Sequence, residues 1–158
     1  MEMEEWRVLV TAEQEVARRR AGVNQLPSRV DLLSKALSSS SAWDRSVALD
    51  FLRLFPEDVP KLLDLLVDLS LSTGWTRSAL EAIMAARKEV EPSQFARVAL
   101  ERLSDGEVED YLRLADVLVE IEAWEALSAV IDKAAESDNY EIREFSRSFT
   151  ESHGDMLP

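Results

Sequence analysis

Cysteine is absent from this sequence of 158 residues, so it can form neither a disulfide framework nor a thiolate metal site. Histidine occurs once, as His153, within a Ser-His-Gly-Asp stretch near the C-terminus. A metal site or a nucleophile–histidine mechanism needs companion residues held at short range, and none is apparent. The sequence also lacks an Asp-x-Asp-x-Asp-Gly calcium loop and a glycine-rich phosphate loop. We therefore expect no catalytic residue, no metal and no cofactor.

Glycines are few, and sequence patterns typical of β-strands are nearly absent. Only four glycines occur, and three of them, Gly74, Gly106 and Gly154, lie beside expected helix ends. A short β-run is hinted at only in residues 7–10, which fit a helix as well. No apolar run approaches the roughly 18 residues that span a bilayer, and the longest, 62–71, carries two aspartates. With an acidic N-terminus unlike a signal peptide, these features lead us to expect an all-α protein in the cytoplasm, without membrane contact.

Basic residues are outnumbered, with 18 Lys and Arg against 31 Asp and Glu, which gives a net charge of −13. Residues 101–136 alone hold 3 basic and 11 acidic residues, a net charge of −8. A negative field repels phosphate backbones, so we expect no direct nucleic-acid binding and favour a basic protein partner. The alternative is that the acidic residues only keep the chain in solution.

The sequence does contain an internal repeat with a period of 32 residues. Trp43 recurs as Trp75, and Gly74 recurs as Gly106. Pro60 likewise recurs as Pro92. Self-similarity at a period between about 20 and 50 residues is typical of stacked repeat proteins.

The hydrophobic period of about 3.6 residues predicts about nine helices. Their expected ranges are 4–21, 28–37, 42–54, 59–71, 75–87, 92–103, 107–121, 124–135 and 140–151. A capping-box pattern at residues 11–14 would break the first helix. Pro56 ends the third helix, and Pro60 and Pro92 lie in first turns, where a missing N–H is tolerated.

The third to eighth helices pair into three similar hairpins, and four positions are apolar in every hairpin. These sets are Val47, Ala79 and Tyr111; Phe51, Ile83 and Ala115; Leu66, Val98 and Val130; and Val67, Ala99 and Ile131. Each hairpin would bury these faces against its neighbours. We expect one domain over residues 1–158, with capping helices in 1–38, three repeats in 42–136 and a C-terminal capping helix in 139–151.

Residues 138–143, Asp-Asn-Tyr-Glu-Ile-Arg, resemble the turn and helix start of HEAT repeats. Arg45, Ala48 and Phe51 fit the same helix, while Glu109 replaces the expected arginine in the third unit. The resemblance covers about residues 42–151 and implies a short right-handed solenoid of antiparallel helix hairpins. A TPR-like or other stack of helix hairpins is the alternative.

In such a stack the second helices usually line the concave side. Acidic residues would then protrude from that side or flank the turn at 121–123, with tryptophans at helix starts. The candidate protein-binding residues are Asp64, Asp68, Glu101, Glu120, Glu122, Trp124, Glu125, Asp132, Trp43 and Trp75. The acidic residues would otherwise form a solvated edge. Trp43 and Trp75 are either a ladder that covers the seam between repeats or anchors for a partner.

These features favour a non-enzymatic protein-binding module over an enzyme. Small acidic all-α repeat proteins resemble the immunity proteins of bacterial toxin systems, which suggests a chain that neutralises a cognate basic toxin. The alternative is a scaffold or adaptor subunit of a regulatory or housekeeping complex. HEAT-like folds that act on nucleic acid need a basic groove, and this chain has the opposite charge.

Overall fold

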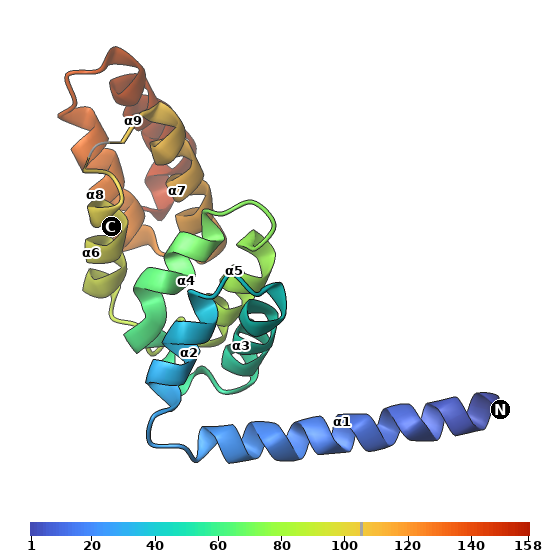
Figure 1. The fold of residues 1–158 in the computed structure, drawn as a ribbon. Helices are drawn as coiled ribbons and strands as arrows, with labels where there is room; N and C mark the ends of the chain where they lie inside the picture. The colour runs from blue at the N-terminus through green and yellow to red at the C-terminus, as the bar shows by residue number, and fades with distance from the viewer. Residues whose placement is uncertain (105) are drawn as a thin grey trace.

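A computed structural model describes residues 1–104 and 106–158, and within them every regular element is helical (Figure 1). The expected all-α class with about nine helices is confirmed for these residues. The elements are α1 (Glu2–Asn24), α2 (Arg29–Leu37), α3 (Ala42–Leu54), the 3₁₀ helix η1 (Pro56–Leu62), α4 (Leu63–Ser70), α5 (Thr76–Ala85), α6 (Pro92–Glu101), α7 (Val108–Glu120), α8 (Trp124–Ala135), α9 (Tyr140–His153) and the 3₁₀ helix η2 (Gly154–Met156).

Polar residues at the helix starts explain why several helices begin where they do. The Ser41 hydroxyl accepts a hydrogen bond from the Asp44 N–H at 3.2 Å at the start of α3. A capping box opens α7, where the Glu107 N–H donates to the Asp110 carboxylate at 2.9 Å. Pro92 occupies the first turn of α6, as expected. Glu107 and Asp110 therefore cap the backbone N–H groups at the start of α7.

Two local expectations are wrong. Residues 59–71 do not form one α-helix, because a 3₁₀ segment with Pro56 and Pro60 precedes α4. Pro60 has no N–H to donate to the carbonyl four residues earlier, so an α-helical turn cannot close there. The first helix also runs without a break, since the Thr11 hydroxyl donates to the Arg7 carbonyl at 2.9 Å within α1.

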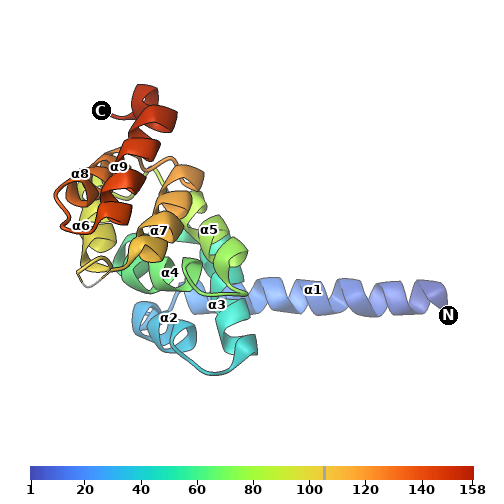
Figure 2. The ribbon, with the colours of Figure 1, turned by 90° about the horizontal axis from the view of Figure 1, so that it is seen from above.

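Helices at alternate places along the chain contact each other. α3 contacts α5, α4 contacts α6, α6 contacts α8, and α7 contacts α9. Cross-contacts of α2 with α3, α4 with α5, and α8 with both α7 and α9 join these helices (Figures 1 and 2). A single apolar cluster runs from α2 to α9. It includes eleven of the twelve repeat positions identified from the sequence, and only Val47 is exposed.

α1 meets the other helices near its C-terminal end, where Val23 packs against the core. It projects away from them in both views (Figures 1 and 2), and none of its 23 residues is buried. Of residues 1–38, which we expected to form an N-terminal cap, only Leu33 and Leu37 of α2 are buried. Glu13 explains the difference, because it lies three or four positions from Leu9, Val10 and Val16 and interrupts the apolar side of α1. No helix in the described part of the chain is long and apolar enough to cross a membrane.

Gly74, in the turn between α4 and α5, has a φ of +92°, a conformation that disfavours any side chain. We expect Gly74→Ala to lower the free energy of unfolding by about 1–2 kcal/mol, measured by urea denaturation. A Cβ would meet nothing within 4 Å, so strain in the backbone alone would cause the loss. The control is Gly22→Ala within helical α1, where alanine is the better helix former. Equal effects of the two substitutions would contradict this explanation.

Candidate protein-binding surfaces

Arg102 at the end of α6 binds two of the predicted acidic residues of α4. Its Nε lies 2.9 Å from Asp68 Oδ1, and its Nη1 lies 3.3 Å from Asp64 Oδ1. Its Nη2 also donates to the Asp64 carbonyl at 2.8 Å. The Arg102 side chain is only 17% exposed, so this guanidinium links α4 to α6 as a structural contact. The carboxylates of Asp64 and Asp68 are thus engaged within the chain.

Glu101, the third predicted acidic residue of this face, is also paired. Arg97 Nη1 lies 2.9 Å from Glu101 Oε1, and Arg97 Nη2 lies 3.7 Å from Asp64. The hydrogen bond and charge of Glu101 raise the pKa of the Arg97 guanidinium, with a smaller contribution from Asp64. The three carboxylates and two guanidinium groups leave one net negative charge. The α4–α6 face is therefore mixed in charge.

The turn between α7 and α8 holds a second group of predicted residues. Arg77 and Arg87, from α5 and the segment after it, reach across to this turn. Arg77 Nη2 lies 3.5 Å from Glu120 Oε1, and Arg87 forms an ion pair with Glu122. The backbone of Glu122 has a φ of +56°, which turns the chain sharply into α8. The sequence holds one signal that could have predicted such pairs, a separation near one repeat. It is 34 residues from Asp68 to Arg102 and 35 from Arg87 to Glu122.

Trp124 lies beside a hollow of about 250 Å³ at the same turn. Trp124 itself is half-buried against the core, and Glu125 next to it is exposed. The lining residues are Arg87, Val90, Pro92, Phe95, Ile121, Glu122, Ala123, Trp124, Glu125 and Ala126. This volume is below the roughly 300–1,000 Å³ of a small-molecule site, so the hollow suits one inserted side chain. The structure thus brings together Glu122, Trp124 and Glu125, as the sequence suggested.

The two repeat-equivalent tryptophans have different surroundings. Trp75 is half-buried against the core, and the Arg45 guanidinium of α3 lies over its ring at 5.7 Å from the centroid. Trp43 is 82% exposed. It borders a groove of about 470 Å³ where the end of α1 meets α2 and α3. Trp75 therefore fits the seam interpretation, whereas Trp43 is accessible to a partner.

The remaining candidates lie apart from these surfaces. Asp132 is exposed on α8. His153 stacks on Phe149, with 5.2 Å between ring centroids and 16° between their planes. Within residues 1–104 and 106–158, no group of three or more His, Cys, Asp or Glu side chains could hold a metal ion.

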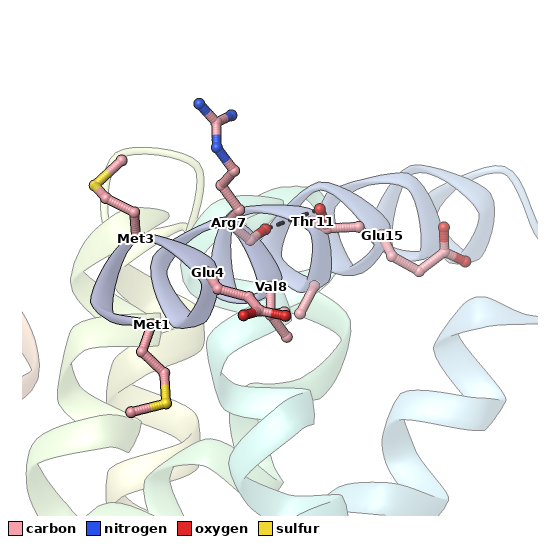
Figure 3. Close-up of a pocket in the computed structure, with 8 residues that line it drawn as sticks. Met1, Met3, Glu4, Arg7, Val8, Thr11 and Glu15 are labelled. Atoms are coloured by element: carbon pink, nitrogen blue, oxygen red, sulfur yellow. Dashed lines mark hydrogen bonds between the residues drawn. The ribbon is translucent and has the colours of Figure 1, made fainter.

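A further hollow, of about 800 Å³, runs along one side of α1. Seven of its eight lining residues belong to this one helix, and the eighth, Met1, directly precedes it (Figure 3). They include the charged side chains of Glu4, Arg7 and Glu15. This hollow therefore lies open along a projecting helix and is not an enclosed ligand site.

Comparison of the chain with models of known protein families, with curated proteins and with solved structures finds no match.

Proposed function

We propose that this chain is a HEAT-like, right-handed α-solenoid that binds another protein. Most concretely, it is an immunity protein that binds and neutralises a cognate basic toxin through its acidic surface. Two features support the architecture: the contacts between alternate helices, and the burial of eleven equivalent repeat positions. A stack of this kind offers an extended surface for a folded partner.

The hollow at the α7–α8 turn is the observation that carries the binding proposal. A lysine or arginine side chain entering it would meet the Trp124 indole and the carboxylates of Glu122 and Glu125. An aromatic face and a carboxylate together hold a cation by cation–π attraction and by charge-assisted hydrogen bonds. Because Arg87 already forms an ion pair with Glu122, we assign the incoming cation mainly to Glu125 and Trp124.

The charge of the chain supports a basic partner of the toxin type. A net charge of −13, with −8 in residues 101–136, creates a field that attracts a basic protein and speeds its encounter. Such steering weakens as salt shortens the range of electrostatic interactions. The association rate should therefore fall with ionic strength more steeply than the dissociation rate rises.

Glu125→Lys is expected to weaken the toxin complex at least about tenfold, which corresponds to about 1.4 kcal/mol. The reversal places a like charge beside the incoming cation, while Glu125 is exposed and its loss should leave the fold intact. The measurement is calorimetric titration with the product of the neighbouring gene, with growth rescue in cells that express that product. The matched control is Glu81→Lys, a reversal at another exposed glutamate, on α5 and outside the lining of the hollow.

Absence of both complex formation at micromolar concentration and growth rescue would overturn the immunity function. Recovery of this chain with a ribosomal, metabolic or signalling assembly, without inhibition of that assembly, would instead support the scaffold alternative. If Glu125→Lys and Glu81→Lys weaken the complex equally, the preference of this acidic chain for a basic partner would stand. The binding site at Trp124 would then be ruled out.

A further inference from the structure

Two apolar surfaces without a neighbour lie at the N-terminal end of this protein. We infer that two copies of the chain pair through antiparallel α1 helices, with the N-terminal half of each α1 seated in the groove beside α3 of the other copy. This inference concerns the end of the molecule away from Trp124 and does not depend on the proposed toxin binding.

The repeat pattern shows which part of α3 lacks its neighbour. Val47 is 58% exposed, whereas its equivalents Ala79 and Tyr111 are almost fully buried. Trp43 is similarly open, whereas its equivalent Trp75 is covered in part by Arg45 of α3, in the preceding hairpin. α5 receives its cover from α3, but no helix occupies the corresponding place before α3, because α1 points away (Figures 1 and 2).

The groove at this place is shaped and lined for an apolar helix. It measures about 470 Å³, and its lining has far more apolar than polar surface. Leu32 of α2 and Phe51 of α3 contribute to it, as do Trp43 and Val47. The second half of α1 forms one wall through Val16, Arg19 and Arg20. An antiparallel α1 from a second copy that packs alongside this α1 would therefore place its own N-terminal end in the groove.

The first half of α1 supplies a matching apolar side. Met3, Trp6 and Val10 recur at helical spacing of three and four residues, and all three are exposed. Trp6 alone leaves 59% of its surface in water. A helix without a fully buried residue gains little from tertiary packing, which supplies most helical stability in proteins. Seating this side in the groove of a second copy would cover both surfaces at once.

Charge selects the antiparallel direction. Residues 2–5 contain three glutamates, Glu2, Glu4 and Glu5, and residues 18–20 are three arginines. An antiparallel pair centred on Thr11 places the glutamates of one copy against the arginines of the other, with Trp6 opposite Val16. A parallel pair would place like charges together. The helix is about 35 Å long, so residues 1–6 reach the groove of the second copy.

The rest of the charge distribution permits such a pair. Residues 1–26 carry a net charge of only −1, with 4 basic and 5 acidic residues, while the acidic excess lies in residues 101–136. That acidic segment forms α7 and α8, at the end of the stack away from α1 (Figure 1). A two-fold arrangement buries the helix-in-groove contact twice, as a self-complementary interface requires.

Sedimentation equilibrium of the full chain between about 1 and 100 µM tests the pairing, and we expect a dimer with a Kd in the micromolar range or below. Trp6→Glu and Val47→Glu should each raise this Kd at least about tenfold. Both residues are exposed in the single copy, so the fold should survive, and circular dichroism checks this. The matched control is Val8→Glu (Figure 3), which places the same charge two positions from Trp6, on roughly the opposite side of α1, and should leave the Kd unchanged.

A charge exchange tests the direction. Changing Glu2, Glu4 and Glu5 to arginine should weaken self-association, and changing Arg18, Arg19 and Arg20 to glutamate in the same chain should restore it. A monomer at about 100 µM would overturn the inference. A dimer sensitive to Trp6→Glu but not to Val47→Glu would remove the groove as the seat of α1. A dimer insensitive to both would place the interface elsewhere.

Discussion

Leu66→Ala is expected to lower the free energy of unfolding by about 3–5 kcal/mol. Leu66 lies on α4 with no exposed surface, at the repeat position that Val98 and Val130 occupy in the later hairpins. Truncation removes apolar contacts and leaves a cavity that helices on both sides cannot readily fill, because α4 contacts α5 as well as α6. Since an unfolding free energy of 5–15 kcal/mol is typical of a domain, this loss would be a large fraction of the total.

Urea denaturation followed by circular dichroism measures this loss as a shift in the midpoint at constant slope. The matched control is Leu112→Ala on α7, which removes the same atoms from a side chain that is exposed. We expect this control to change the free energy of unfolding by less than about 0.5 kcal/mol. A similar loss for both variants would show that residue 66 does not lie in a shared core.

Arg102→Met is expected to lower the free energy of unfolding by about 2–3 kcal/mol, a loss typical of a hydrogen bond to a charged group. Methionine keeps much of the apolar stem but removes the donors to Asp64 and Asp68. These carboxylates lie four positions apart on α4, so their mutual repulsion is exposed when the guanidinium is lost. The Asp64 carbonyl also loses its donor from α6.

The control for Arg102 is Arg97→Met on the same helix. Arg97 contacts Glu101 and Asp64, but its side chain is 51% exposed and its ion pairs are open to water. Surface pairs of this kind contribute little, so no clear change in the urea midpoint is expected. High salt should reduce any small effect of Arg97 and leave most of the Arg102 effect, because partly buried pairs are screened less. Equal midpoints for the two variants would contradict a structural role for Arg102.

Much of the fold was predictable from hydrophobic period and helix-end residues. The ranges 42–54 and 124–135 agree with α3 and α8, because Ser41 caps the first and a tight turn fixes the second. The 3₁₀ turn at Pro60 was not predicted, because hydrophobic spacing does not show that the proline lacks the N–H that an α-helical hydrogen bond needs. The exposure of Val47 was missed for another reason: a repeat shows which residues are equivalent, but not whether the first unit has a neighbour.

The candidate surfaces were predictable only in part. Clustering of Glu122, Trp124 and Glu125 followed from their closeness in sequence, and the structure adds the hollow beside them. Arg77, Arg87 and Arg102 belong to other hairpins than the acidic side chains they pair with, so hydrophobic period alone did not predict these contacts. The total of 31 acidic residues therefore overstates how many carboxylates are unpaired, as Asp64 and Asp68 illustrate.

The projecting α1 has a consequence for how the chain loses its structure. Amide hydrogen bonds in the first half of α1 of a single copy can open one turn at a time, since none of its residues is buried and Val23, which packs against the core, lies near the other end. Those of α8, which contacts α6, α7 and α9, can open only when the cooperative unit dissolves around them. A protease would therefore trim the first half of α1 long before it reached the middle of the molecule, and the remainder would keep its melting temperature.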